Sequence, residues 1–133
     1  MRMKQEEFFM QLKHVALVCS SEEESDRFYT NVLGLKKLGS KTIPSTLMNQ
    51  IFNIDAGLKI INYANESIAF EVFIDNIKRA EKNKIDHICI QVENLGSFLE
   101  KCRQMEIEII QVPKGDAMIT FIKDDDGNLF EIK

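Results

Sequence analysis

The chain has 133 residues, of which 44% are hydrophobic and 29% charged, and its formal net charge is −4. This length predicts one domain with its own core, residues 1–133, and no apolar run approaches the ~18 residues that span a bilayer. Acids and bases are scattered along the chain, which excludes a basic stripe for nucleic acid, and the basic residues within 78–84 are interpreted as a solvated face.

The first predicted element is an aliphatic strand over residues 12–19. Ser20 and Ser21 then precede three glutamates, which is a typical helix N-terminus, and Gly34 is expected to end that helix. Residues 35–74 are interpreted as a run of strands, with turns at 43–45, 55–57 and 65–67. Residues 75–84 are polar and suit a connector.

The same order then repeats. A second aliphatic strand is expected over 85–92, and Asn94 can cap a helix over 95–105. Strands are predicted over 108–112, 118–123 and 129–133. An internal repeat of this length indicates two βαβββ modules, about 10–75 and about 84–133. The predicted fold class is therefore α+β, with the two modules forming one curved mixed sheet and the helices on its outer face.

Two histidines and two glutamates occupy matching places in this repeat. His14 and His87 lie at the same position of the first strand in each half, and Glu71 and Glu131 lie at the same position of the last strand. Strand alternation places all four on the face opposite the helix. Mixed imidazole and carboxylate donors suit one divalent metal, and burying them without a cation would be costly. We therefore predict a metal site with His14, Glu71, His87 and Glu131 as ligands and Ni, Zn, Co, Mn or Fe as the ion.

Two stretches, FYTNVLGL at 28–35 and DGNLFE at 126–131, together with the two-module plan, closely resemble the vicinal oxygen chelate superfamily. That group includes glyoxalase I, methylmalonyl-CoA epimerase, extradiol dioxygenases, and the fosfomycin and bleomycin resistance proteins. The ligand order is similar to that of small bacterial glyoxalase I. The resemblance implies a metal-dependent lyase or isomerase that acts on vicinal oxygens through a metal-stabilised enediolate, with Glu131 or Glu71 as the base; of the two, Glu131 is preferred.

Glutathione recognition is the least well matched feature of this resemblance. Bacterial glyoxalase I has Arg and Asn where this chain has Val18 and Asp75, so glutathione hemithioacetal is expected to be a poor substrate. Strand parity gives the candidates for the substrate pocket, which are Ala16, Phe73, Cys89, Gln91, Thr120 and Leu129.

Two alternative functions remain open from the sequence. One is a CoA-thioester epimerase, whose phosphate-binding rim would have to come from Lys78, Arg79, Lys82 and Lys84. The other is a protein that sequesters a drug or another ligand without chemistry, which needs no metal.

The sequence also gives expectations for assembly and location. Each half supplies only two ligands, so the halves must pair within a chain or across a homodimer, and a homodimer is expected. Three cysteines without paired spacing and a charged N-terminal stretch that is no signal peptide indicate a cytoplasmic protein with a small-molecule substrate.

Overall fold

The computed structural model describes residues 12–77 and 85–133, which form two βαβββ modules joined in tandem. The elements of the first module are β1 (Val15–Cys19), α1 (Glu22–Asp26), a π-helical continuation η1 (Arg27–Val32), β2 (Lys36–Ile43), α2 (Ser45–Phe52), β3 (Leu58–Ala64) and β4 (Ala69–Ile74). Those of the second are β5 (His87–Ile90), α3 (Leu95–Gln104), β6 (Ile109–Lys114), β7 (Ala117–Lys123) and β8 (Leu129–Ile132).

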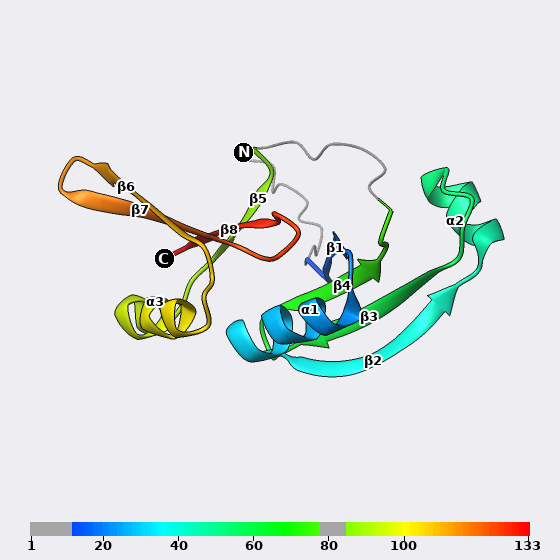
Figure 1. Ribbon diagram of the computed structural model, residues 1–133, viewed down its shortest axis with the longest axis horizontal. Helices are drawn as coiled ribbons and strands as arrows, with labels where there is room; N and C mark the ends of the chain where they lie inside the picture. The colour runs from blue at the N-terminus through cyan, green and yellow to red at the C-terminus, as the bar shows by residue number, and fades with distance from the viewer. Residues whose placement is uncertain (1–11, 78–84) are drawn as a thin grey trace, which may run out of the picture.

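Both modules have the same sheet topology. The strand orders are β1-β4-β3-β2 and β5-β8-β7-β6, with the first and last strands of each module parallel and the other pairs antiparallel. The predicted α+β fold of two βαβββ modules is thus confirmed. The strands form two separate four-stranded sheets instead of the one continuous sheet expected, and Figure 1 shows α2 at the outer end of one and the β6–β7 hairpin at the outer end of the other.

The predicted caps begin the helices. Ser21 accepts a hydrogen bond from the Glu24 backbone N–H at 3.1 Å, and Asn94 accepts one from the Ser97 N–H at 2.9 Å. Each cap satisfies one of the unpaired donors of a first helical turn. Gly34, with φ of +74°, ends the first helical segment in the left-handed region that glycine tolerates best.

Helix α2 lies where only strands were expected, and the reading of residues 35–74 as a pure run of strands was wrong here. Pro44 is extended at the N-cap and Asn53 ends the helix with φ of +56°. The buried Met48 packs with Leu58, Ile60 and Phe73 in a small second core. The turn predicted at 43–45 is the start of this helix. Pro44 fits at the N-cap because no backbone N–H is needed there for a hydrogen bond within the helix.

The main core joins the two modules. The rings of Phe70 in β4 and Phe130 in β8 have centroids 6.1 Å apart, and Phe28 and Tyr29 of η1 pack against both modules. All four rings are almost completely buried. Because Phe70 and Phe130 are on the helix-facing sides of their strands, the two sheets meet through those sides and through η1.

A buried carboxylate ties the modules together at one end of this core. The Asp124 side chain accepts hydrogen bonds from the Tyr29 hydroxyl at 3.2 Å and the Asn128 amide at 2.6 Å, and the Cys19 thiol lies 3.6 Å away. The backbone N–H groups of Asp126 and Asn128 donate to its other oxygen. Burial is the main cause that raises the pKa values of Tyr29 and Cys19, so both remain protonated donors.

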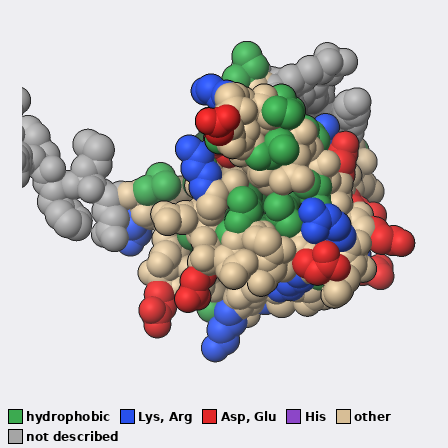
Figure 2. All heavy atoms as spheres, turned by 90° about the vertical axis from the view of Figure 1, so that its left-hand side faces the viewer, with side chains coloured by type: hydrophobic (Ala, Val, Ile, Leu, Met, Phe, Trp, Pro, Cys, Tyr) green, Lys and Arg blue, Asp and Glu red, His purple; other side chains and the backbone are tan. Residues whose placement is uncertain are grey.

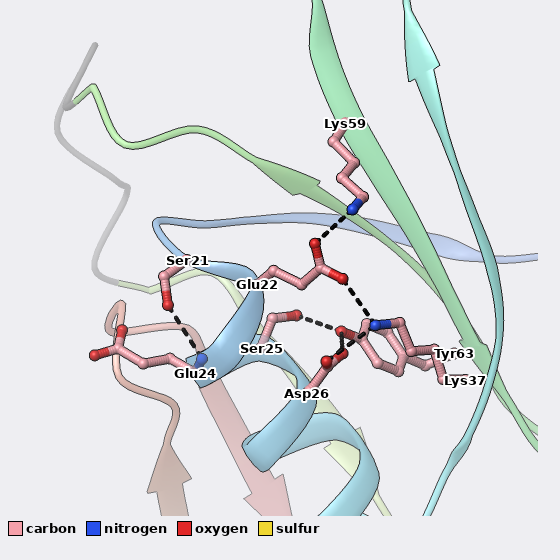
Figure 3. Close-up of polar contacts among 8 residues, drawn as sticks. All are labelled: Ser21, Glu22, Glu24, Ser25, Asp26, Lys37, Lys59 and Tyr63. Atoms are coloured by element: carbon pink, nitrogen blue, oxygen red, sulfur yellow. Dashed lines mark hydrogen bonds and ion pairs between the residues drawn. The ribbon is translucent and has the colours of Figure 1, made fainter.

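Helix α1 is fastened to the first sheet by a surface network of charges (Figure 3). Glu22 pairs with Lys37 at 2.8 Å and with Lys59 at 2.6 Å, and Asp26 pairs with Lys37 at 2.9 Å. The Tyr63 hydroxyl donates to Asp26 at 2.6 Å. Hydrogen bonds from Lys37 and then Lys59 lower the pKa of Glu22 to about 2.

Cys19, Cys89 and Cys102 are all free. None of the helices within residues 12–77 and 85–133 combines the length and the apolarity needed to cross a bilayer. The basic stretch at 78–84 lies outside the described residues.

Candidate metal centre

The first module brings His14 and Glu71 together. Parallel pairing sets Ala16 of β1 opposite Glu71 of β4, and His14 lies on the same face two residues earlier. His14 Nε2 is 3.2 Å from Glu71 Oε2, and their side chains are 46% and 28% exposed. The pair therefore lies at an open surface of the sheet, on the side away from the main core.

The second module repeats this pair with His87 and Glu131. His87 Nε2 is 3.7 Å from Glu131 Oε1, with side-chain exposures of 36% and 20%. The other ring nitrogen, Nδ1, lies 2.8 Å from the Ile85 carbonyl oxygen. A carbonyl can only accept, so Nδ1 carries the hydrogen, and in the neutral ring Nε2 keeps its lone pair toward Glu131. A metal-binding imidazole is commonly oriented in this way.

The donor separations fit ligands of a single ion. Two donors that each lie about 2.1 Å from a metal are about 3.0 Å apart at a right angle and about 3.4 Å apart at a tetrahedral angle. The observed 3.2 Å and 3.7 Å are close to these values. Each module thus carries two donors of types that suit a divalent transition metal.

The two halves do not converge within one copy of the chain. Phe70 and Phe130 face the shared core, and Glu71 and Glu131 are their next neighbours along the strands, so both carboxylates point away from that core. In the part of the chain that the structure describes, no three His, Cys, Asp or Glu residues lie where they could hold one ion. A metal site with all four donors would need a second set of donors for each half.

The predicted pocket residues are placed as follows. Ala16 and Leu129 line a cavity of about 740 Å³ along the edge of β1, together with His87. Cys89 is exposed and pairs in register with Glu131. Phe73 belongs to the small core beneath α2, and Gln91 lines a different cavity at the junction of the modules.

Thr120 lies on the other side of its strand. Phe121 pairs with Glu131 and shares its face, so the adjacent Thr120 points toward the side of the buried Ile122. It is 2% exposed and accepts a hydrogen bond from the Gln111 amide at 3.3 Å.

Two residues that lie beside Glu71 and Glu131 were not predicted from the sequence. Phe121 contacts the His87 ring edge-on, with centroids 5.5 Å apart, and Asn62 pairs with Glu71 at the equivalent place in the first sheet. The glutamates therefore have different flanks, an amide for Glu71 and an aromatic ring for Glu131. The strand register decides which residues these are, and strand alternation alone does not fix that register.

A two-module βαβββ protein with a His–Glu pair in each half is the class that these observations define. Residues 11–132 match the sequence family described as the Glyoxalase/Bleomycin resistance protein/Dioxygenase superfamily, and the chain belongs to that superfamily. The chain is 28% identical to the lactoylglutathione lyase of Salmonella typhimurium (strain LT2) over 131 residues, which are 92% of this chain and 91% of the relative. It is 25% identical to the probable lactoylglutathione lyase of Synechocystis sp. over 131 residues, which cover 92% and 94% of the two chains.

Solved structures share this fold. A glyoxalase family protein from Enterococcus faecalis superposes with a TM-score of 0.74 at 21% identity, covering 95% of this chain and 98% of that one. The fosfomycin resistance protein FosX from Listeria monocytogenes, crystallised with Mn(II) and sulfate ion, gives a TM-score of 0.67 at 16% identity, covering 94% and 92%. At these identities the likeness concerns the fold.

Proposed function

We propose that this protein is a metal-dependent enzyme of the glyoxalase type, a lyase or isomerase that acts on a small substrate with two adjacent oxygens. The observation that carries the proposal is the duplicated His–Glu pair, with donor separations of 3.2 Å and 3.7 Å. The lactoylglutathione lyases among the relatives support the reaction class. A divalent ion bound there polarises the substrate oxygens and stabilises the negative charge that develops when a proton leaves the neighbouring carbon.

A homodimer would complete the site. His14 and Glu71 of one copy would meet His87 and Glu131 of the second, because the two half-sites of a single copy point away from their common core. Apolar surface is available for such pairing. Figure 2 shows hydrophobic side chains between charged ones on the side of the β6–β7 hairpin and α3, and Val112 and Met118 of the hairpin are about half exposed.

Glu131 is our candidate for the base, and Glu71 for the firmer ligand. The Asn62 amide lies beside Glu71 in the register and can donate a hydrogen bond that holds that carboxylate in place. Glu131 has the Phe121 ring as its register neighbour, and the exposed Lys133 ammonium lies 3.9 Å from its Oε2. As the base, the Glu131 carboxylate would accept a proton from bound substrate and return it to the adjacent carbon.

Metal content tests the proposal. Wild-type protein loaded with Ni, Co, Mn or Zn should retain about one ion per chain, and His14→Ala or His87→Ala should lose most of it. Glu24→Gln, on an exposed position of α1, is the matched control. Wild-type protein that retains none of these ions would contradict the metal site and favour a ligand-sequestering role.

Mixing the two histidine variants tests whether the site spans two copies. In a heterodimer of His14→Ala with His87→Ala, one of the two sites has all four ligands, so an equal mixture after refolding should regain about a quarter of the wild-type metal. Sites closed within one chain would regain none. Sedimentation at micromolar concentration should give a dimer, and a monomer that retains its metal would exclude the shared site.

A further inference from the structure

A second cavity, of about 250 Å³, lies at the opposite end of the module junction from Asp124. Its walls come from the end of η1, from β4, from the end of β5 and from α3, and they are mainly apolar. Leu33, Ile68, Val92 and Phe98 are among the residues that line it. The cavity lies on the helix side of both sheets, away from the faces that carry the His–Glu pairs.

The internal repeat relates this cavity to the Asp124 end of the module junction. At the Asp124 end, the β7–β8 turn meets the end of β1, and the Asn128 amide donates to the Val18 carbonyl at 3.1 Å. The equivalent β3–β4 turn and the end of β5 both border the cavity. Counted from the helix N-caps, Cys102 holds the place of Tyr29. Counted back from Phe130 and Phe70, Ala64 holds the place of Asp124.

Two small side chains, neither of which lines the cavity, therefore stand where the first junction has a phenol and a carboxylate. The first junction is filled by a hydrogen-bonded cluster, whereas the second keeps an open space. Protein interiors are otherwise close-packed, so an apolar space of this size is a candidate for a small ligand. Its volume is below the range typical of drug-sized pockets, which restricts the ligand to a few carbon atoms beyond its polar group.

Four polar residues, Asn65, Gln91, Glu93 and Lys101, border the cavity, and three of them define the proposed chemistry. The Asn65 side-chain oxygen accepts the backbone N–H groups of Ser67 and Ile68, both at 2.8 Å, which orients the side chain and leaves its NH₂ group for another acceptor. Lys101 and Glu93 are exposed and oppositely charged. Neither forms an ion pair within residues 12–77 and 85–133.

We propose that this cavity is a second binding site, for a free α-amino acid with a branched apolar side chain. The ligand's side chain enters the apolar space among Leu33, Ile68 and Phe98. Its carboxylate accepts from Lys101 and from the Asn65 amide, and its ammonium group donates to Glu93. A simple carboxylate or a simple amine satisfies only one of the two charges, so both are poorer ligands.

Calorimetric or NMR titration of the full-length protein tests this site with three probes of matched shape. L-Leucine carries both charges, 4-methylpentanoate lacks the ammonium group, and isopentylamine lacks the carboxylate. Leucine is expected to bind about tenfold more tightly than either analogue. Absence of leucine binding up to about 10 mM, or equal binding of all three probes, would overturn the proposal.

Single substitutions assign the charges separately. Glu93→Gln should remove the advantage of leucine over 4-methylpentanoate, and Lys101→Met should remove its advantage over isopentylamine. Ile68→Phe should fill the cavity and abolish binding, while Glu24→Gln should leave it unchanged. Glu93 and Lys101 are exposed, so substitutions there should leave the fold intact. The two charge variants therefore still test the proposal if the cavity-filling variant Ile68→Phe fails to fold. Unchanged preferences in both charge variants would exclude the assignment.

Discussion

The Asp124 cluster makes a sharp prediction about what joins the two modules. Asp124→Ala removes the acceptor for the Tyr29 hydroxyl and for the Asn128 amide, while the two backbone N–H groups of its turn can reach water more easily. Each buried donor left without a partner costs about 1–3 kcal/mol. The free energy of unfolding should therefore fall by about 3 kcal/mol, out of the about 5–15 kcal/mol typical of a domain.

Urea unfolding followed by circular dichroism, at one fixed protein concentration, measures this loss. The midpoint should decrease with little change in slope, and the melting temperature should fall by about 10 °C. Tyr29→Phe removes a single donor and should cost about 1 kcal/mol. Asp125→Ala, at the exposed neighbouring position of the same turn, should stay within about 0.5 kcal/mol of wild type. A loss below about 1 kcal/mol for Asp124→Ala would show that the cluster does not stabilise the junction.

Three further predictions concern the surface network, the imidazole and the substrate. The lowered pKa of Glu22 contributes stability that is present above about pH 4.5 and is lost as the pH falls toward about 2. Glu22→Gln should therefore cause a small loss of stability near pH 7 that vanishes below about pH 2, in thermal melts across pH with Glu23→Gln as the control. Phe121→Ala removes the ring beside His87 and should weaken zinc binding about 10–100-fold, measured by competition with a chelator. An unchanged zinc affinity would show that the ring does not orient the imidazole. Glutathione hemithioacetal should be a poor substrate, because Val18 is exposed on the site face and offers no cation; a kcat/KM on the order of 10⁶ M⁻¹s⁻¹ or more would refute this.

Most of the fold could be predicted because the sequence carries it twice. The two aliphatic strands, the caps Ser21 and Asn94 and the repeated order of elements each follow from local chemistry. Helix α2 was missed because Leu47, Met48, Ile51 and Phe52 follow a helical spacing that a turn signal at Pro44 obscured. A proline before an apolar stripe can begin a helix as readily as it can mark a turn.

The candidate site could be predicted only in part, for a reason of register. Alternation along a strand pairs His14 with Glu71 and His87 with Glu131 once the strands are known. It does not say which residue of β7 lies opposite Glu131, and a shift of one residue exchanges Phe121 for Thr120. The two modules meet through the contact between Phe70 and Phe130. The sequence shows only that each of these residues is apolar and lies in a strand, which does not predict that the two rings touch.

The two modules carry the same candidate metal ligands but different residues beside them. A shared ion needs donors from both halves, and the donors are identical residue types at His14 and His87 and at Glu71 and Glu131. Their flanks have no such requirement, and the register places Asn62 beside one carboxylate and Phe121 beside the other. With the proposed shared site, a substrate would therefore meet an amide on one side of the ion and an aromatic ring on the other. A symmetric ligand set with asymmetric flanks is sufficient to fix which of two adjacent substrate oxygens lies next to Glu131, and hence which carbon loses its proton.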